Sequence, residues 1–232
     1  MQLHGKNGCS QKRSLAVETL YCWLADRFAD VKADFHPRSW LSRYRHTSIG
    51  YLTKMLLFYH GMGIVLLLVG SALIEQVLPG HQEPSIPRSL SGVLTAGPLE
   101  ETIFFGIPFY FFGNVYFVLV TGAVWVAVHL LNTDTLSINN LAFGNLFFVM
   151  PSLFFSLRTW ISGKGWFSVV VHSAWNGVFF AAGCSTGEFK CTAIDSEMTT
   201  TAVVFVLSAA LLVAAYALYK RRENKERQRL AA

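Results

Sequence analysis

Charged residues are scarce in this sequence of 232 residues. Asp, Glu, Lys and Arg together make up 14% of it, 53% of it is hydrophobic, and the mean hydropathy is +0.40. Soluble globular domains carry about 25% charged residues, so this composition excludes an ordinary soluble domain. Basic residues outnumber acidic ones, but most of them flank apolar segments, where they act as membrane topology signals. We therefore predict no nucleic-acid partner.

Several familiar sequence signals are also missing. The chain has no HExxH helix, the usual signature of a zinc protease. It has no internal repeat, which many secondary transporters show. The first stretch, residues 1–14, is polar, so we expect no cleavable signal there.

Long apolar segments are abundant after residue 48. A helix needs about twenty apolar residues to cross a ~30 Å hydrocarbon layer, and the sequence repeats that pattern six times. We predict an all-α, polytopic membrane bundle with an amphipathic helix over residues 14–35 before the first span. The predicted spans cover about residues 51–78, 91–112, 114–131, 138–157, 166–182 and 201–219, the fourth bent at Pro151.

The distribution of basic residues predicts which segments lie in the cytoplasm and which lie in the membrane. We expect a cytoplasmic N-terminal segment over residues 1–48, a membrane domain over residues 49–219 with its core at about 91–183, and a basic cytoplasmic tail over residues 220–232. Seventeen of the 19 Lys and Arg residues, all except Arg88 and Lys190, then lie on one side. This asymmetry predicts a multi-pass protein of the cell membrane with both termini cytoplasmic.

The four cysteines follow the same division. Cys184 and Cys191 lie in one short loop on the outer side, where a local disulfide is expected. Cys9 and Cys22 fall on the cytoplasmic side, where we expect them to stay reduced.

Two adjacent carboxylates, Glu100 and Glu101, lie inside the second apolar segment. Ionisable groups at membrane depth are costly and usually mark function. Pro98 prefers the first turn of a helix, so we expect a short break at residues 96–97 and the two Glu in a first helical turn. One Glu kept basic beside one kept protonated could activate a water molecule. Paired Glu can also form a proton or cation site, or a structural link between helices.

Two imidazoles occur on later spans, each with a partner four residues away. The third span contains Trp125 and His129, and the fifth contains His172 and Asn176. A spacing of four places both members on one helix face. A Glu with one His can deprotonate water, and a second His with Asn can donate hydrogen bonds to an oxyanion. Alternatively, one Glu and the two His could hold zinc with an open position for water.

With these motifs the chain resembles the CPBP family, which contains the type II CaaX prenyl endopeptidases and the bacteriocin-processing, Abi-like enzymes. The family pattern is a Glu pair followed by Arg, then Phe-x-x-x-His, then His-x-x-x-Asn or Asp, on successive membrane helices. The first motif matches Glu100 and Glu101, the second His129, and the third His172 with Asn176. The resemblance covers about residues 91–180.

The resemblance implies an intramembrane endopeptidase. Glu100 and His129 would activate the water, His172 and Asn176 would stabilise the oxyanion, and Glu101 would be the supporting acid. If zinc is used, its ligands would be Glu100, His129 and His172. The substrate would be a peptide or a lipidated protein, met among membrane lipids.

The chain departs from the family pattern at one important position. Phe105 stands where the family has Arg, one helical turn after Glu101, so without that partner a buried carboxylate should protonate or find another cation. The competing function is a non-catalytic membrane adaptor with this fold, or an ion-coupled transporter. The enzyme interpretation requires Glu100, His129 and His172 to converge. His129 could otherwise be an interfacial side chain, and His60, which matches no motif, is expected to be a hydrogen bonder in helix packing.

Overall fold

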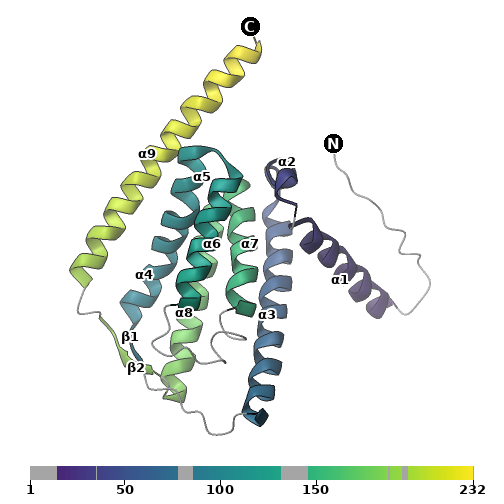
Figure 1. The fold of residues 1–232 in the computed structure, drawn as a ribbon, viewed down its shortest axis with the longest axis vertical. Helices are drawn as coiled ribbons and strands as arrows, with labels where there is room; N and C mark the ends of the chain where they lie inside the picture. The colour runs from purple at the N-terminus through teal and green to yellow at the C-terminus, as the bar shows by residue number, and fades with distance from the viewer. Residues whose placement is uncertain are drawn as a thin grey trace. The chain divides into compact units, whose positions relative to one another are not determined.

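The protein is described by a computed structural model over residues 15–34, 36–77, 86–131, 146–187, 189–194 and 198–231. The chain forms two compact units, Met1–Ser39 and Trp40–Ala232, which are drawn in Figure 1.

The first unit contains the helix α1 (Leu15–Asp34) and the 3-10 turn η1 (Pro37–Ser39). The amphipathic helix predicted over residues 14–35 coincides closely with α1. Arg27 pairs with Asp30 one turn later at 3.2 Å. Cys22 is disulfide-bonded, which differs from the expectation of a reduced cysteine, an expectation that rested on the compartment alone.

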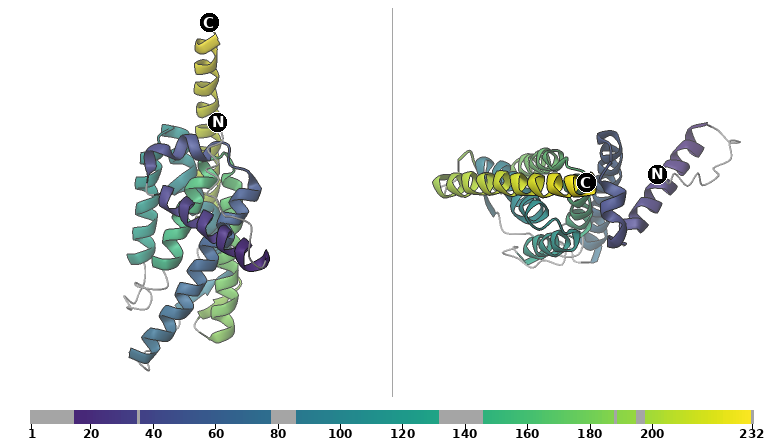
Figure 2. Two further views of the ribbon diagram at one scale, coloured as in Figure 1. Left: turned by 90° about the vertical axis from the view of Figure 1, so that its right-hand side faces the viewer. Right: turned by 90° about the horizontal axis from the view of Figure 1, so that it is seen from above.

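The second unit consists of long helical segments that run in alternating directions and lie side by side (Figures 1 and 2). One of them is continuous from residue 90 to 112 although it changes helix type, because η2 is a π-helix between two α-helices. The elements of this unit are α2 (Trp40–Tyr44), α3 (Ile49–Val77), β1 (Ile86–Ser89), α4 (Leu90–Glu100), η2 (Glu101–Gly106), α5 (Ile107–Phe112), α6 (Val115–Leu131), α7 (Leu146–Ile161), α8 (Gly165–Thr186), β2 (Phe189–Thr192) and α9 (Met198–Ala231).

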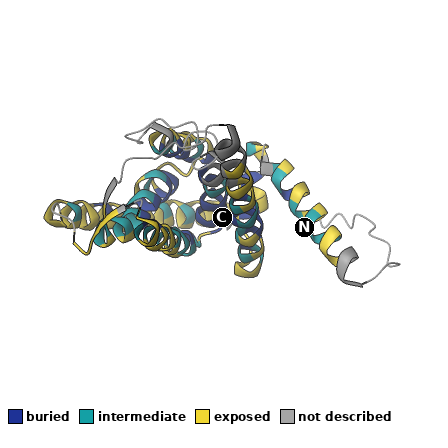
Figure 3. Cartoon of the chain, turned by 90° about the horizontal axis from the view of Figure 1, so that it is seen from below, coloured by how far each residue is buried: buried dark blue, intermediate teal, exposed yellow. Residues whose placement is uncertain are grey.

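Among the described residues, three helices, α3, α8 and α9, are long and apolar enough to cross a membrane, and α6 is a shorter apolar helix. Their large apolar side chains are partly directed outward, as at Val206 and Val213 of α9, which are exposed, and Figure 3 shows exposed residues along the outer helix faces. This is the surface expected of a helical membrane protein. The number of six spans stays a prediction.

The expected break before the Glu pair is wrong, because α4 continues through Pro98 to Glu100. Pro98 lacks the amide hydrogen that would bond the carbonyl of Leu94. The hydroxyl of Ser173 on α8 donates to that carbonyl instead, at 3.4 Å. Glu100 and Glu101 therefore lie in the middle of a continuous helical segment and not in a first helical turn.

Other span boundaries shift by a few residues. The helix α7 ends at Ile161, later than the predicted 157, and runs through Pro151. The predicted start of that span at 138 lies outside the described residues. The helix α9 continues through the basic tail to Ala231, so the charged residues after Tyr219 extend a helix whose apolar part ends there.

The strand β1, just before α4, pairs in parallel with β2, just after α8. The sequence did not lead us to expect this two-stranded ribbon. Ile86 pairs with Phe189 and Ser89 with Thr192, and a disulfide joins Cys184 at the end of α8 to Cys191 in β2. Ser89 also caps α4, since its hydroxyl accepts a hydrogen bond from the amide of Gly92 at 3.1 Å. The ribbon thus connects the start of α4 with the end of α8.

Glycines allow the helices around the Glu pair to pack closely. A Cβ at Gly97 would lie 2.8 Å from the backbone nitrogen of Ser173, so α4 and α8 touch there through a glycine. The ring of Trp160 is seated between Gly106 and Gly165, where any Cβ would overlap the indole. The buried core around it combines aromatic and aliphatic side chains and includes Phe105 and Trp125.

Candidate active site

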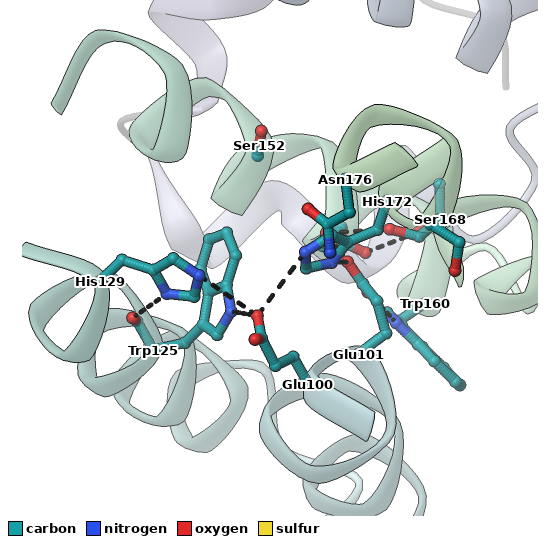
Figure 4. Close-up of polar contacts among 12 residues, drawn as sticks. Glu100, Glu101, Trp125, His129, Ser152, Trp160, Ser168, His172 and Asn176 are labelled. Carbon is teal, nitrogen blue, oxygen red and sulfur yellow. Dashed lines mark hydrogen bonds and ion pairs between the residues drawn. The ribbon is translucent and has the colours of Figure 1, made fainter. Parts of the chain in front are cut away.

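Glu100 is the point at which three helices meet (Figure 4). Its Oε2 accepts a hydrogen bond of 2.6 Å from the indole Nε1 of Trp125 on α6. The same oxygen lies 3.3 Å from Nε2 of His129 and 3.6 Å from Nε2 of His172 on α8. The side chain of Glu100 is 25% exposed. One carboxylate oxygen therefore lies close to three nitrogen atoms while the side chain stays partly exposed.

Glu101 has the opposite environment, with a side chain only 2% exposed. Its Oε1 accepts a hydrogen bond of 2.6 Å from the hydroxyl of Ser156, which is itself 2.9 Å from the hydroxyl of Ser168. Its Oε2 accepts a hydrogen bond of 2.8 Å from the indole Nε1 of Trp160. Both oxygens of this buried carboxylate are thus satisfied by side-chain donors, as a buried polar group requires.

His172 bridges the two carboxylates. Its Nδ1 lies 3.4 Å from Oε1 of Glu101, and its Nε2 faces Oε2 of Glu100. A carboxylate on one ring nitrogen sets the orientation of an imidazole and the nitrogen that carries the proton. Glu101 therefore orients His172 toward Glu100.

His129 is held in a comparable way. Its Nδ1 is 3.0 Å from the backbone carbonyl of Trp125, one turn earlier on α6, and the two rings are 4.5 Å apart. This contact directs Nε2 toward Glu100. The sequence analysis left open an interfacial His129, but in the structure the ring faces the Glu pair.

The π-helix η2 separates the directions of the two adjacent carboxylates. It begins at Glu101 and ends at Gly106, and such π segments are frequent at functional sites. Glu100 at the end of α4 contacts α6 and α8, whereas Glu101 contacts α7 and α8. The two adjacent carboxylates therefore contact different helices and have different environments.

Asn176 lies beside His172 on α8 but is not bonded to the Glu and His side chains. Its Nδ2 donates a hydrogen bond of 3.2 Å to the backbone carbonyl of Val93 on α4. This bond helps hold α4 against α8. An amide nitrogen carries two hydrogens, so one remains for another acceptor.

Phe105, the departure from the family pattern, is fully buried in this structure. Its ring packs edge-on against Trp125 at 5.7 Å and lies against Gly122 of α6. The position therefore supports the indole that holds Glu100. The donors that Glu101 needs come from Ser156, Trp160 and His172 in place of an arginine.

Three of these residues, Ser156, Trp160 and Ser168, were not identified from the sequence. Ser168 is four residues before His172, so the helical spacing that paired His172 with Asn176 could also have found it. Ser156 and Trp160 share the same spacing on α7, but neither side chain is an acid, a base or a metal ligand of the kind that the motifs contain.

Zinc fits this arrangement poorly. Carboxylates and imidazoles are common zinc ligands. Nδ1 of each histidine also has an oxygen neighbour, as the second ring nitrogen of a zinc-binding histidine usually does. Both Nε2 atoms, however, are directed at one carboxylate oxygen, at 3.3 Å from His129 and 3.6 Å from His172. Within the described ranges, no group of three or more His, Cys, Asp or Glu side chains is arranged to hold a metal ion.

His60 forms a separate buried cluster. Its ring stacks on Trp175 at 5.4 Å, and its Nδ1 lies 3.2 Å from the carbonyl of Leu56. Its Nε2 is 3.5 Å from the hydroxyl of Ser152. These contacts join α3 to α7 and α8, in keeping with the expected packing role.

Comparison with known families adds an independent observation. Residues 82–178 match the family model described as type II CAAX prenyl endopeptidase Rce1-like. The matched segment contains Glu100, Glu101, His129, His172 and Asn176, and it agrees with the resemblance derived from the motifs. No curated protein and no solved structure matches the chain. The match shows that this segment, which is less than half of the chain, is similar to the Rce1-like CAAX prenyl endopeptidases.

Proposed function

We propose that this chain, whose residues 82–178 match the Rce1-like type II CAAX prenyl endopeptidases, is an intramembrane endopeptidase that uses a water molecule activated by Glu100. The water oxygen attacks the carbonyl carbon of the scissile peptide bond while Glu100 takes a proton from the water. The carbon–nitrogen bond of the tetrahedral intermediate then breaks. Glu100 returns the proton to the leaving amine, and no covalent enzyme intermediate forms.

The convergence of α4, α6 and α8 on Oε2 of Glu100 carries this proposal. Three nitrogen atoms surround that one oxygen, so the carboxylate is oriented and its other oxygen, Oε1, remains to accept a proton from water. A base held in this way costs little reorganisation during the reaction. The partial exposure of Glu100 admits both water and a peptide carbonyl.

Glu101 acts through His172 and does not touch the substrate. Its burial and its three partners keep it in place, and it holds His172 with Nε2 toward the reacting water. The proposed donors to the oxyanion are the remaining hydrogen of the Asn176 amide and, when the imidazole carries a proton on both ring nitrogens, Nε2 of His172; His129 assists Glu100.

The family match points to a peptide or a prenylated protein as substrate. We place the site within a six-span bundle in the cell membrane, with both termini in the cytoplasm. An adaptor or a transporter does not require a shared water position between Glu100, His129 and His172. The observed convergence therefore favours hydrolysis over these alternatives.

Purified protein in lipid nanodiscs, incubated with a farnesylated CaaX peptide and with the same peptide lacking the lipid, tests the function. We expect mass spectrometry to detect a fragment released from the C-terminal end, and its formation to fall at least tenfold in His172→Ala. Trp166→Phe, a change at an exposed residue on the same helix, is the matched control. Equal release by wild type and His172→Ala would contradict the mechanism.

A further inference from the structure

A cavity of about 190 Å³ lies at the charged end of the bundle, away from the Glu pair. It is formed by the turn after α2, the end of α5, the turn between α7 and α8, and the charged part of α9. The residues that line it are Arg45, Phe109, Tyr110, Ile161, Ser162, Gly163, Tyr216, Tyr219, Lys220 and Glu223. The proposed peptidase mechanism uses none of them.

Positive charge is in surplus at the rim of this cavity. Glu223 accepts contacts from Lys220 at 2.8 Å, from Arg227 at 2.9 Å and from Arg45 at 3.4 Å. One carboxylate thus faces three cations. Arg45 and Lys220 line the cavity together with Glu223, whereas Arg227 does not, so the lining keeps one net positive charge for another anion.

Three phenols form the aromatic wall of the cavity. The ring of Tyr110 packs against those of Tyr216 at 5.1 Å and Tyr219 at 5.5 Å. In the part of the chain that the structure describes, none of the three hydroxyls makes a hydrogen bond. Tyrosine hydroxyls in partly buried positions normally find a partner, and an oxyanion would accept from them.

The position of the cavity identifies the class of anion. It lies where the apolar part of α9 ends at Tyr219 and the charged residues begin, which is the level of lipid headgroups in a membrane-spanning helix. Arg222, also at this level, donates a hydrogen bond of 2.6 Å to the backbone carbonyl of Phe111 and fastens α9 to α5. Basic residues at the cytoplasmic interface attract anionic headgroups.

We propose that this cavity binds the phosphate of an anionic lipid headgroup, with Arg45 and Lys220 pairing with the phosphate oxygens and the tyrosine hydroxyls donating hydrogen bonds. Charge-assisted hydrogen bonds of this kind are the strong ones. The aromatic wall contacts the glycerol part of the lipid. This site is distinct from the proposed catalytic centre and does not depend on peptidase activity.

Native mass spectrometry of the full-length protein, titrated with dihexanoyl phosphatidylglycerol, tests the proposal. We expect one saturable lipid, with dihexanoyl phosphatidylcholine bound at least tenfold more weakly. Lys220→Gln should weaken phosphatidylglycerol binding at least fivefold. Arg221→Gln removes the same charge from the neighbouring residue, which does not line the cavity, and should change the affinity less than twofold.

A second pair of variants tests the phenols without altering charge. Tyr216→Phe should weaken binding severalfold, and Tyr116→Phe, at an exposed residue of α6 outside the cavity, should not. Equal losses in Lys220→Gln and Arg221→Gln would overturn the proposal, because they would show general charge attraction only. Displacement of the lipid by an equal concentration of inorganic phosphate would overturn the assignment to a lipid headgroup.

Discussion

The indole Nε1 of Trp160 donates a hydrogen bond of 2.8 Å to Oε2 of Glu101, across 59 residues of sequence. Together with the hydroxyl of Ser156, this donor satisfies a carboxylate that has lost the arginine of the family pattern. The buried Glu101 can therefore hold His172 without a neighbouring guanidinium. The departure at Phe105 is thus compatible with an assembled site.

The variant Trp160→Phe tests whether the indole of Trp160 replaces the family arginine as a donor to Glu101. The phenyl ring retains much of the packing against Gly106 and Gly165, but the buried carboxylate loses a partner, which costs about 1–3 kcal/mol. We expect a lower melting temperature and at least a tenfold lower kcat for peptide hydrolysis. Trp166→Phe is again the control, and an unchanged kcat in Trp160→Phe would show that the indole donor is not needed.

The contact of α4 with α8 predicts a difference between two glycines. A Cβ at Gly97 would press on the backbone of Ser173, whereas a Cβ at Gly61 meets nothing within 4 Å. We expect Gly97→Ala to lower the free energy of unfolding by about 1–3 kcal/mol through overpacking. Gly61→Ala should be neutral or stabilising by up to about 1 kcal/mol, since alanine favours a helix. Thermal unfolding in the same detergent compares them, and equal melting temperatures would contradict the close approach.

The sequence predicts the ionisable residues of the site but not the neutral residues that hold them in place. Glu100, His129 and His172 stand out because charged or titratable side chains in apolar segments are rare. Trp160 and Ser156 do not stand out, since both residue types are common in membrane helices and their role exists only through contact with Glu101. The continuation of α4 through Pro98 was missed for the same reason, because it depends on Ser173 of another helix.

The charged tail should respond to acid. Lys220, followed by Arg227, lowers the pKa of Glu223 to about 2. A lowered folded-state pKa means that the ionised form stabilises the fold above the unfolded value near 4.5, and that this contribution disappears as the pH falls toward 2. The contribution is small, below about 1 kcal/mol, because the partners are exposed.

The variant Glu223→Gln measures this contribution. Its melting temperature should lie below that of the wild type at pH 6, and the gap should close between pH 4.5 and 2. Asp26→Asn, in the first unit, is the control for a general charge effect. A gap that stays constant over this pH range would contradict the ionisation of Glu223 as its cause.

Metal removal is expected to leave the activity intact. The two imidazoles are directed at the Glu100 carboxylate, an arrangement that serves hydrogen bonding to a base. We expect hydrolysis to change less than twofold after chelation, and metal analysis of the purified protein to find no stoichiometric zinc. Activity that is lost on chelation and restored by zinc would require Glu100, His129 and His172 to be metal ligands instead.

The rate of peptide hydrolysis by Glu100→Gln tests the central proposal most directly. The amide retains the size of the side chain and can still bond to Trp125, but it cannot take a proton from water. General-base contributions are typically about 10²–10⁴-fold, so kcat should fall by at least a hundredfold while Trp166→Phe leaves it unchanged. Hydrolysis by Glu100→Gln at the wild-type rate would contradict the account.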